Sequence, residues 1–168
     1  MTWPWTNEEN YKPAHILVED HDASIREMMT SLLAAEGYEC RVAETLVETS
    51  RILRSGENID LVVCGIEEWA EEDFKHMIRA TDIVPVLVST GIVDLMAKVL
   101  QMGAYDVLLK PFQREQLIFA VGRALEHRRL KIENFYLKDR LGLGSGIDLH
   151  LSQLVELRRK ARNRGKRA

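Results

Sequence analysis

Apolar residues along this chain occur in short continuous runs that alternate with stretches of helical spacing. The run Ala14–Val18 (AHILV) predicts a buried strand. From Ile25 to Leu33 the apolar residues fall at i, i+3, i+4, i+7 and i+8, the spacing of one helix face, and Gly37 predicts the end of that helix. After a polar lead-in, the chain is therefore predicted to form a strand and then a helix.

The same alternation of strand and helix recurs along the chain. Further strands are predicted at Tyr38–Val42, Leu61–Cys64, Pro85–Val88 and Val107–Leu109. Further helices are predicted at Val47–Arg54, around Phe74 to Ile78, around Leu95 to Leu100, and from Arg114 onward. Continuously apolar strands that alternate with amphipathic helices predict an α/β fold, with a five-stranded parallel sheet covered on both faces. Ligands of such sheets bind beyond the carboxyl ends of the strands.

The last helix is predicted to continue to about Leu141, because the segment HRRLKIENFYLKDRL contains neither glycine nor proline. Helical spacing places Leu130, Leu137 and Leu141 on one side of this segment, and Ile132 and Phe135 on another. Two interpretations stay open. The segment is either the end of an amphipathic helix packed on its own domain, or a helix that forms a homodimer or binds a partner.

Beyond this helix, Gly142–Gly146 (GLGSG) predicts a flexible linker. Residues 147–168 predict a short amphipathic helix followed by a basic cluster. The predicted organisation is thus a lead-in at 1–13, a domain at 14–126, a helical extension at 127–141, a linker at 142–146 and an amphipathic basic tail at 147–168.

Length and composition agree with one domain that carries an appendage. The chain has 168 residues, a formal net charge of -3 and 46% hydrophobic residues, which suits one core of ordinary size. It has no run of about 18 apolar residues and no basic, apolar start, so we expect a cytoplasmic protein without a membrane span. Cys40 and Cys64 stand inside predicted strands at a spacing that indicates no zinc site, and both are expected to be buried thiols.

Polar residues with distinct chemistry follow three of the predicted strands. Glu19 and Asp20 end the first strand, Thr90 ends the fourth, and Lys110 ends the fifth. Two neighbouring acids can hold a hard divalent cation, a hydroxyl can bond an anionic oxygen, and a lysine offers a compact positive charge to a phosphoryl group. Together these residues predict a site that handles phosphoryl groups.

With these motifs, ILVED, IDLVVCG, VPVLVST and GAYDVLLKPF, the sequence resembles the receiver domain of bacterial two-component response regulators, whose small stand-alone example is the chemotaxis regulator. The resemblance covers His15 to Glu126. It implies a doubly wound, flavodoxin-like sheet with strand order 2-1-3-4-5, and an aspartate at the end of the third strand that a histidine kinase phosphorylates. It assigns the acid pair and its metal to Glu19 and Asp20, the hydroxyl to Thr90 and the lysine to Lys110.

The position that the resemblance assigns to the phosphoaccepting aspartate is Gly65. Glycine has no side-chain oxygen, so no acyl phosphate can form there, and a Mg²⁺ site would lose a carboxylate. We therefore expect a degenerate receiver (a pseudo-receiver) that is not an enzyme, has no resident cofactor and binds Mg²⁺ weakly if at all. Glu19 and Asp20 are then expected to pair with Lys110.

The departures from the family pattern leave two questions open. The loop after the first strand looks one residue longer than in the family, so the acid pair could include Asp22 in place of Glu19. Glu67, two residues after Gly65, could point toward the vacated space, although a solvated acidic loop is the simpler interpretation. Trp69 and Val107 replace a proline and an aromatic switch residue that the family usually has.

The sequence favours a signalling module that works through protein contacts without phosphorylation. The expected surface comprises the fourth helix, the fifth strand and the last helix, with Val107, Leu130, Phe135 and Leu137 as interface residues. Its partners would be signalling proteins such as a histidine kinase or a downstream effector, or a second copy of the chain. The alternative is a nucleic-acid-binding regulator that uses the basic tail, with the receiver as the dimerisation platform; a metal enzyme is disfavoured because no nucleophile is evident.

Overall fold

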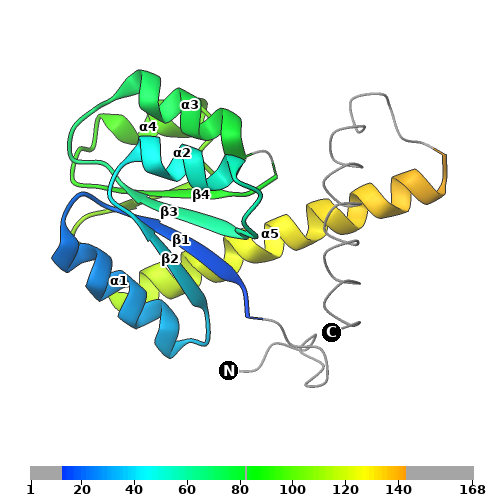
Figure 1. The fold of residues 1–168 in the computed structure, drawn as a ribbon, viewed down its shortest axis with the longest axis horizontal. Coiled ribbons are helices and arrows are strands. Elements are labelled where there is room, and N and C mark those ends of the chain that lie inside the picture. The colour runs from blue at the N-terminus through cyan, green and yellow to red at the C-terminus, as the bar shows by residue number, and fades with distance from the viewer. Residues whose placement is uncertain (1–12, 82, 143–168) are drawn as a thin grey trace. The chain divides into compact units, whose positions relative to one another are not determined.

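The computed structural model describes residues 13–81 and 83–142, and these form a five-stranded parallel sheet in the order β2-β1-β3-β4-β5 (Figure 1). The strands are β1 His15–Glu19, β2 Glu39–Ala43, β3 Leu61–Gly65, β4 Val86–Thr90 and β5 Asp106–Leu109. The predicted α/β fold, strand order and parallel pairing are confirmed.

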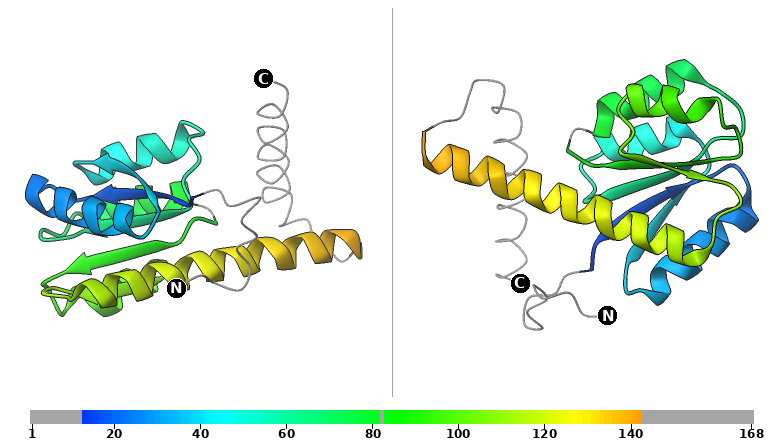
Figure 2. Two further views of the ribbon diagram at one scale, coloured as in Figure 1. Left: turned by 90° about the horizontal axis from the view of Figure 1, so that it is seen from below. Right: turned by 180° about the vertical axis from the view of Figure 1, so that it is seen from behind.

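Within residues 13–81 and 83–142, five helices connect or follow the strands. They are α1 Ala23–Ala35, α2 Leu46–Arg54, α3 Glu71–Thr81, α4 Leu95–Gln101 and α5 Arg114–Arg140. Helix α1 and the first half of α5 cover one face of the sheet, while α2, α3 and α4 cover the other (Figures 1 and 2). The sheet is therefore doubly wound, as the alternation of strands and helices predicted.

Two hydrophobic clusters fill the spaces between the sheet and its helices, and alternate residues of each strand belong to one or the other. In β1, Leu17 belongs to the cluster under α2, α3 and α4, whereas Ile16 and Val18 belong to the cluster under α1 and α5. All five residues of β3 and of β4 are buried. Strands covered on both faces must be apolar throughout, which explains their continuous hydrophobic runs.

Strand β2 lies at an edge of the sheet, and this position corrects one prediction. Cys64 in β3 is fully buried, but Cys40 in β2 is only partly buried. Both thiols are free. Burial raises the pKa of Cys40 to about 11 and that of Cys64 well above its ordinary value. The prediction of a buried thiol is therefore wrong for Cys40, because an edge strand has one neighbouring strand instead of two.

The chain divides into two compact units, residues 1–126 and 127–168. In the second unit the described residues, 127–142, continue α5 as far as Arg140, as the sequence predicted to within one residue. Most of the predicted lead-in (1–12), the linker residues after Gly142 and the basic tail lie outside the described residues. Among the described helices, none combines the length and the apolarity that crossing a membrane requires.

Candidate functional site

The carboxyl ends of four parallel strands bring the predicted site residues to one edge of the sheet. Glu19 of β1 lies beside Cys64 of β3, Gly65 lies beside Ser89 of β4, and Thr90 lies beside Leu109 of β5. Asp20 and Lys110 each come one residue after their strands. The structure therefore brings together every residue that the sequence proposed for the remnant site, together with Gly65.

Asp20 and Lys110 form the central contact of this site. Asp20 is completely buried, and its Oδ2 lies 3.2 Å from Lys110 Nζ. Its Oδ1 accepts a hydrogen bond from the Asp22 backbone N–H at 2.9 Å and lies 3.5 Å from His21 Nδ1. The expected pairing of an acid of the first strand with Lys110 is thus present for Asp20.

Glu67 is the second carboxylate on Lys110, with its Oε1 2.5 Å from Nζ. Partial burial acts to lower the pKa of Lys110, but the hydrogen bonds and charges of Glu67 and Asp20 outweigh it and raise that pKa above its ordinary value. Lys110 is therefore a cation shared between two carboxylates. Glu67 therefore does extend to the strand-end site, where its carboxylate pairs with Lys110.

The space beside Gly65 is already filled. A Cβ atom added to Gly65 would lie 1.9 Å from Asp20 Oδ2 and 2.7 Å from Asp20 Cγ. Real Cβ contacts are never this short, so any side chain at this position requires Asp20 to move. The Asp20 carboxylate thus occupies the volume in which a side chain at position 65 would begin.

Glu19 is buried beside this ion pair, with 3% of its surface exposed. Its Oε2 has no hydrogen-bond partner among the described residues. Desolvation and the neighbouring charge of Asp20 raise the pKa of Glu19 from 4.5 to about 8, although a hydrogen bond from Gly65 and the charges of Lys110 and Arg26 oppose the shift. Glu19 is therefore largely protonated at neutral pH.

Thr90 is fully buried, and its hydroxyl already has partners on both sides. Its Oγ1 donates a hydrogen bond to the Ile66 carbonyl at 2.7 Å and accepts one from the Ile92 backbone N–H at 3.1 Å. The hydroxyl consequently ties the end of β4 to the segments that follow β3 and β4.

Asp22 serves as the N-cap of α1. Its side chain accepts hydrogen bonds from the backbone N–H groups of Ser24, at 2.8 Å, and Ile25, at 3.4 Å. Its side chain is also exposed, in contrast to the buried Glu19 and Asp20. Asp22 thus serves to start the helix.

The residues present do not fit a magnesium site. Mg²⁺ requires several hard oxygen ligands in near-octahedral geometry. Here Gly65 supplies no carboxylate, and Asp20 Oδ2 is paired with Lys110. Across residues 13–81 and 83–142, no group of three or more His, Cys, Asp or Glu side chains could hold a metal ion.

A second cluster, which the sequence did not reveal, connects the segment after β3 to α4. Lys98 Nζ of α4 lies 4.7 Å from the centre of the Trp69 ring and 2.7 Å from Glu71 Oε2. Hydrogen bonds from Lys98, Lys75 and Trp69 lower the pKa of Glu71 to about 2. Trp69 departs from the family pattern, but no local sequence pattern indicates its contact with Lys98, which lies far away in the sequence.

The surface made by α4, β5 and α5 carries exposed apolar side chains. Leu100 is 43% exposed, Leu109 41% and Phe119 66%. Arg123 lies 5.2 Å from the centre of the Phe119 ring and pairs with Asp106 at 2.5 Å. Val107, expected at this interface, is partly buried and packs against the cluster under α4.

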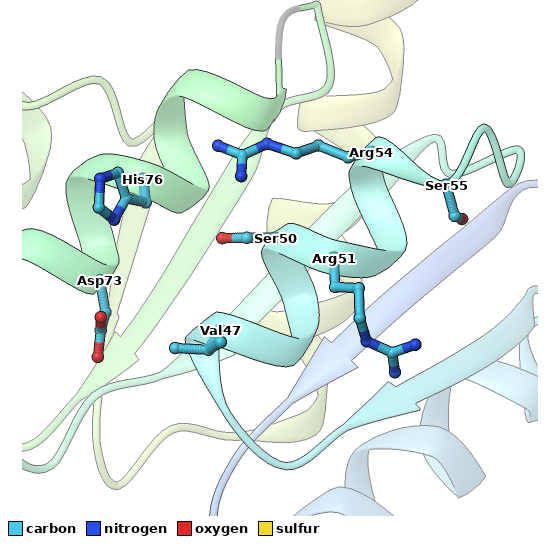
Figure 3. A pocket seen from close by; sticks show the side chains of 7 residues that line it. All are labelled: Val47, Ser50, Arg51, Arg54, Ser55, Asp73 and His76. Carbon is cyan, nitrogen blue, oxygen red and sulfur yellow. The ribbon is translucent and has the colours of Figure 1, made fainter.

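A surface groove of about 570 Å³ lies between α2 and α3 (Figure 3). Ser50 and Arg54 of α2 and His76 of α3 are among its lining residues. Most of the lining side chains are exposed, and the groove shares no residue with the site at the carboxyl ends of the strands. It therefore adds nothing to the chemistry of that site.

Comparison with known proteins agrees with the geometry. The family described as "Response regulator receiver domain" matches residues 16–122. The chain is 28% identical over 156 residues to an NtrX-like response regulator of Rickettsia felis, covering 87% of this chain and 33% of that protein. It is 35% identical over 129 residues to the DNA-binding transcriptional regulator NtrC of Rhizobium meliloti, covering 72% of this chain and 26% of that protein.

Solved structures show the same fold. NtrX of Brucella abortus is similar with a TM-score of 0.70 and 29% identity, over 78% of this chain and 30% of that one. A receiver domain protein of Clostridium thermocellum is similar with a TM-score of 0.64 and 26% identity, over 70% of this chain and 98% of that one. The chain spans a third or less of the length of the curated relatives named above.

Proposed function

The chain belongs to the response regulator receiver domain family of two-component signalling, and from that premise we propose that it acts as a pseudo-receiver, through protein contacts that need no phosphorylation. The observation that carries the proposal is Gly65 at the end of β3. It has no side-chain oxygen to phosphorylate, and the space beside it holds the buried carboxylate of Asp20. A receiver without an acceptor at this position can still present its surface to a partner.

The surface made by α4, β5 and α5 supports this proposal. Isolated exposed apolar residues are ordinary, but Leu100, Leu109 and Phe119 belong to three consecutive elements of the chain. The Asp106–Arg123 ion pair adds a polar element from β5 and α5 to the same surface. Such a combination of apolar centre and charged surroundings is suited to binding a signalling protein, such as a histidine kinase or a downstream effector.

The helical segment after Glu126 supports a second contact surface. Leu130 is 50% exposed, Leu137 55% and Leu141 70%, and their spacing of seven and four residues places them on one side of a helix. Phe135 is 7% exposed, in contrast to these leucines. We propose Leu130 and Leu137 as contacts in a homodimer or with a partner. Phe135 and Val107 were expected at the same interface, but Phe135 is buried and Val107 packs against the core of the first unit.

Incubation with acetyl phosphate and Mg²⁺ tests the phosphorylation-independent mode. The expected outcome is an intact mass without a phosphoryl increment on any acidic side chain, while a conventional receiver domain treated in parallel gains one. Peptide mapping would locate any increment, with Glu67 as the residue to inspect first. A phosphorylated acidic side chain in the wild-type protein would overturn the proposal.

Nucleic-acid binding through the basic tail is the second candidate. It is favoured by the seven Lys and Arg residues between 158 and 167 and by the description of the NtrC relative as a DNA-binding transcriptional regulator. Binding through phosphates would weaken steeply with added salt and would be lost on deletion of residues 156–168. Binding that survives this deletion, or no salt-sensitive binding to duplex DNA, would exclude it.

A further inference from the structure

The strand-end site contains its own cation. Lys110 Nζ lies within 3.2 Å of one carboxylate and 2.5 Å of another, contributed by Asp20 and Glu67. The lysine side chain is 17% exposed, and Asp20 is completely buried. The Lys110 ammonium offsets one of the two carboxylate charges, and it provides the pairing that a completely buried carboxylate such as that of Asp20 requires.

The position of Asp20 depends on Gly65. The Asp20 carboxylate lies in the volume that a Cβ on Gly65 would need. With any other residue at 65, Asp20 would have to turn away and lose its present distance to Lys110. Gly65 therefore lacks a side chain that could accept a phosphoryl group, and it also leaves room for the ion pair between Asp20 and Lys110.

The ammonium group and a divalent cation compete for the same oxygen. Asp20 Oδ2 is the atom that faces Lys110, and Asp20 Oδ1 already accepts the Asp22 N–H. A metal ion that bound Asp20 Oδ2 would have to displace Lys110 or share this oxygen with it, and Oδ1 already accepts a hydrogen bond in the turn that leads into α1. The donor set thus disagrees with the magnesium site that the fold family implies.

We propose that the ammonium group of Lys110 permanently replaces the divalent cation of the receiver fold. Two carboxylates hold it: that of Asp20, which lies in the space beside Gly65, and that of Glu67. This inference rests on the proposed function, since it names the positive charge that faces Asp20 in a receiver that takes no phosphoryl group. Glu67 connects the Lys110 ion pairs to the rest of the domain, because Glu67 belongs to the segment between β3 and α3. The same segment carries Trp69, which contacts Lys98 of α4.

Substitution of Lys110 in the full 168-residue chain tests the proposal. Lys110→Gln should lower Tm by about 5 °C or more, because it leaves the buried Asp20 carboxylate without its cation. Lys110→Arg, which keeps the charge, should recover at least half of that loss. The matched control is Lys75→Gln, which removes exposed ion pairs to Glu71 and Glu72 and should change Tm by less than about 2 °C.

Added Mg²⁺ or Mn²⁺ separates cation replacement from an ordinary packing role. Neither ion should change the Tm of the wild-type protein, whereas either should restore part of the stability lost in Lys110→Gln. Wild-type stabilisation by these ions, an unchanged Tm for Lys110→Gln, or a Lys110→Gln variant that gains nothing from either ion would each overturn the inference.

These outcomes are distinct from failure of the proposed function. A wild-type protein that is stabilised by Mg²⁺ but gains no phosphoryl group from acetyl phosphate overturns the cation replacement alone. A wild-type protein that becomes phosphorylated overturns the proposed function, whatever its response to metal ions.

Discussion

The carboxylate of Asp20 lies in the space where a side chain on Gly65 would begin, with Oδ2 only 1.9 Å from the position of the missing Cβ. The two residues belong to neighbouring strand ends, since β1 and β3 are paired in parallel. Gly65 in β3 and the buried Asp20 after β1 therefore form one structural unit, and a substitution of either residue should change the environment of the other.

Gly65→Ala is the smallest change that tests this unit. The added methyl group cannot coexist with the present Asp20 side chain, so the variant should lose about 1–3 kcal/mol of unfolding free energy. Urea denaturation measures the loss. Gly91→Ala is the control, because a Cβ there would approach nothing closer than Glu67 Oε2 at 4.0 Å. Equal stability of the two variants would contradict the observed placement of Asp20.

Glu19 predicts a dependence of stability on pH. The pKa of its carboxyl is raised from 4.5 to about 8 in the folded protein, so folding favours the protonated form. This favourable contribution is complete below the unfolded pKa and is lost as the pH rises from about 4.5 to about 8. Glu19→Gln stays neutral and keeps an acceptor for the Gly65 N–H. Its stability relative to the wild-type protein should therefore rise by about 4 kcal/mol between pH 5 and pH 9, since each pH unit between the two pKa values is worth about 1.4 kcal/mol.

The control for this pH series is Glu27→Gln, on an exposed position of α1. Chemical denaturation at pH 5, 7 and 9 should show a stability difference for Glu19→Gln that grows with pH and a constant small difference for Glu27→Gln. A Glu19→Gln difference that does not vary with pH would mean that Glu19 is charged in the folded state.

Lys98, in the last turn of α4, is predicted to hold this helix against the segment that follows β3. Lys98→Ala removes both the contact with the Trp69 ring and the ion pair with Glu71, which together should stabilise this region by about 1 kcal/mol. Hydrogen exchange in α4 should then be several-fold faster. Lys75→Ala also removes a Glu71 ion pair, at 2.9 Å, but leaves the contact between Lys98 and the Trp69 ring in place, so exchange in α4 should stay unchanged. The same acceleration in both variants would assign the effect to the charge of Glu71 alone.

The sequence predicted the location of the site better than its internal arrangement. Glu19, Asp20, Thr90 and Lys110 could be placed together because each follows an apolar run, and parallel strands end at one edge of a sheet. The conformation of the Asp20 side chain could not be predicted, because it depends on the absence of a Cβ on a residue far along the chain. In the same way, apolar spacing predicted the cores beneath the helices, whereas the Trp69–Lys98 contact has no periodic signal.

Moving the carboxylate from β1 to β3 tests the coupling directly. Gly65→Asp alone should be destabilising, because the new side chain meets Asp20 and adds a further negative charge beside it. Asp20→Ala alone should be destabilising because it leaves Lys110 with Glu67 as its remaining acidic partner within the site. In the double variant the clash is removed and a carboxylate again faces the lysine.

The double variant should therefore be more stable than the sum of the single changes by about 1–3 kcal/mol, the range expected for residues in direct contact. A double-mutant cycle by urea denaturation measures this coupling energy. The control cycle combines Asp20→Ala with Gly91→Ala, which should be additive to within about 0.5 kcal/mol. If the Asp20 and Gly65 changes were also additive, the two residues would be energetically independent, and the Asp20 carboxylate could not be the group that occupies the place of a side chain at position 65.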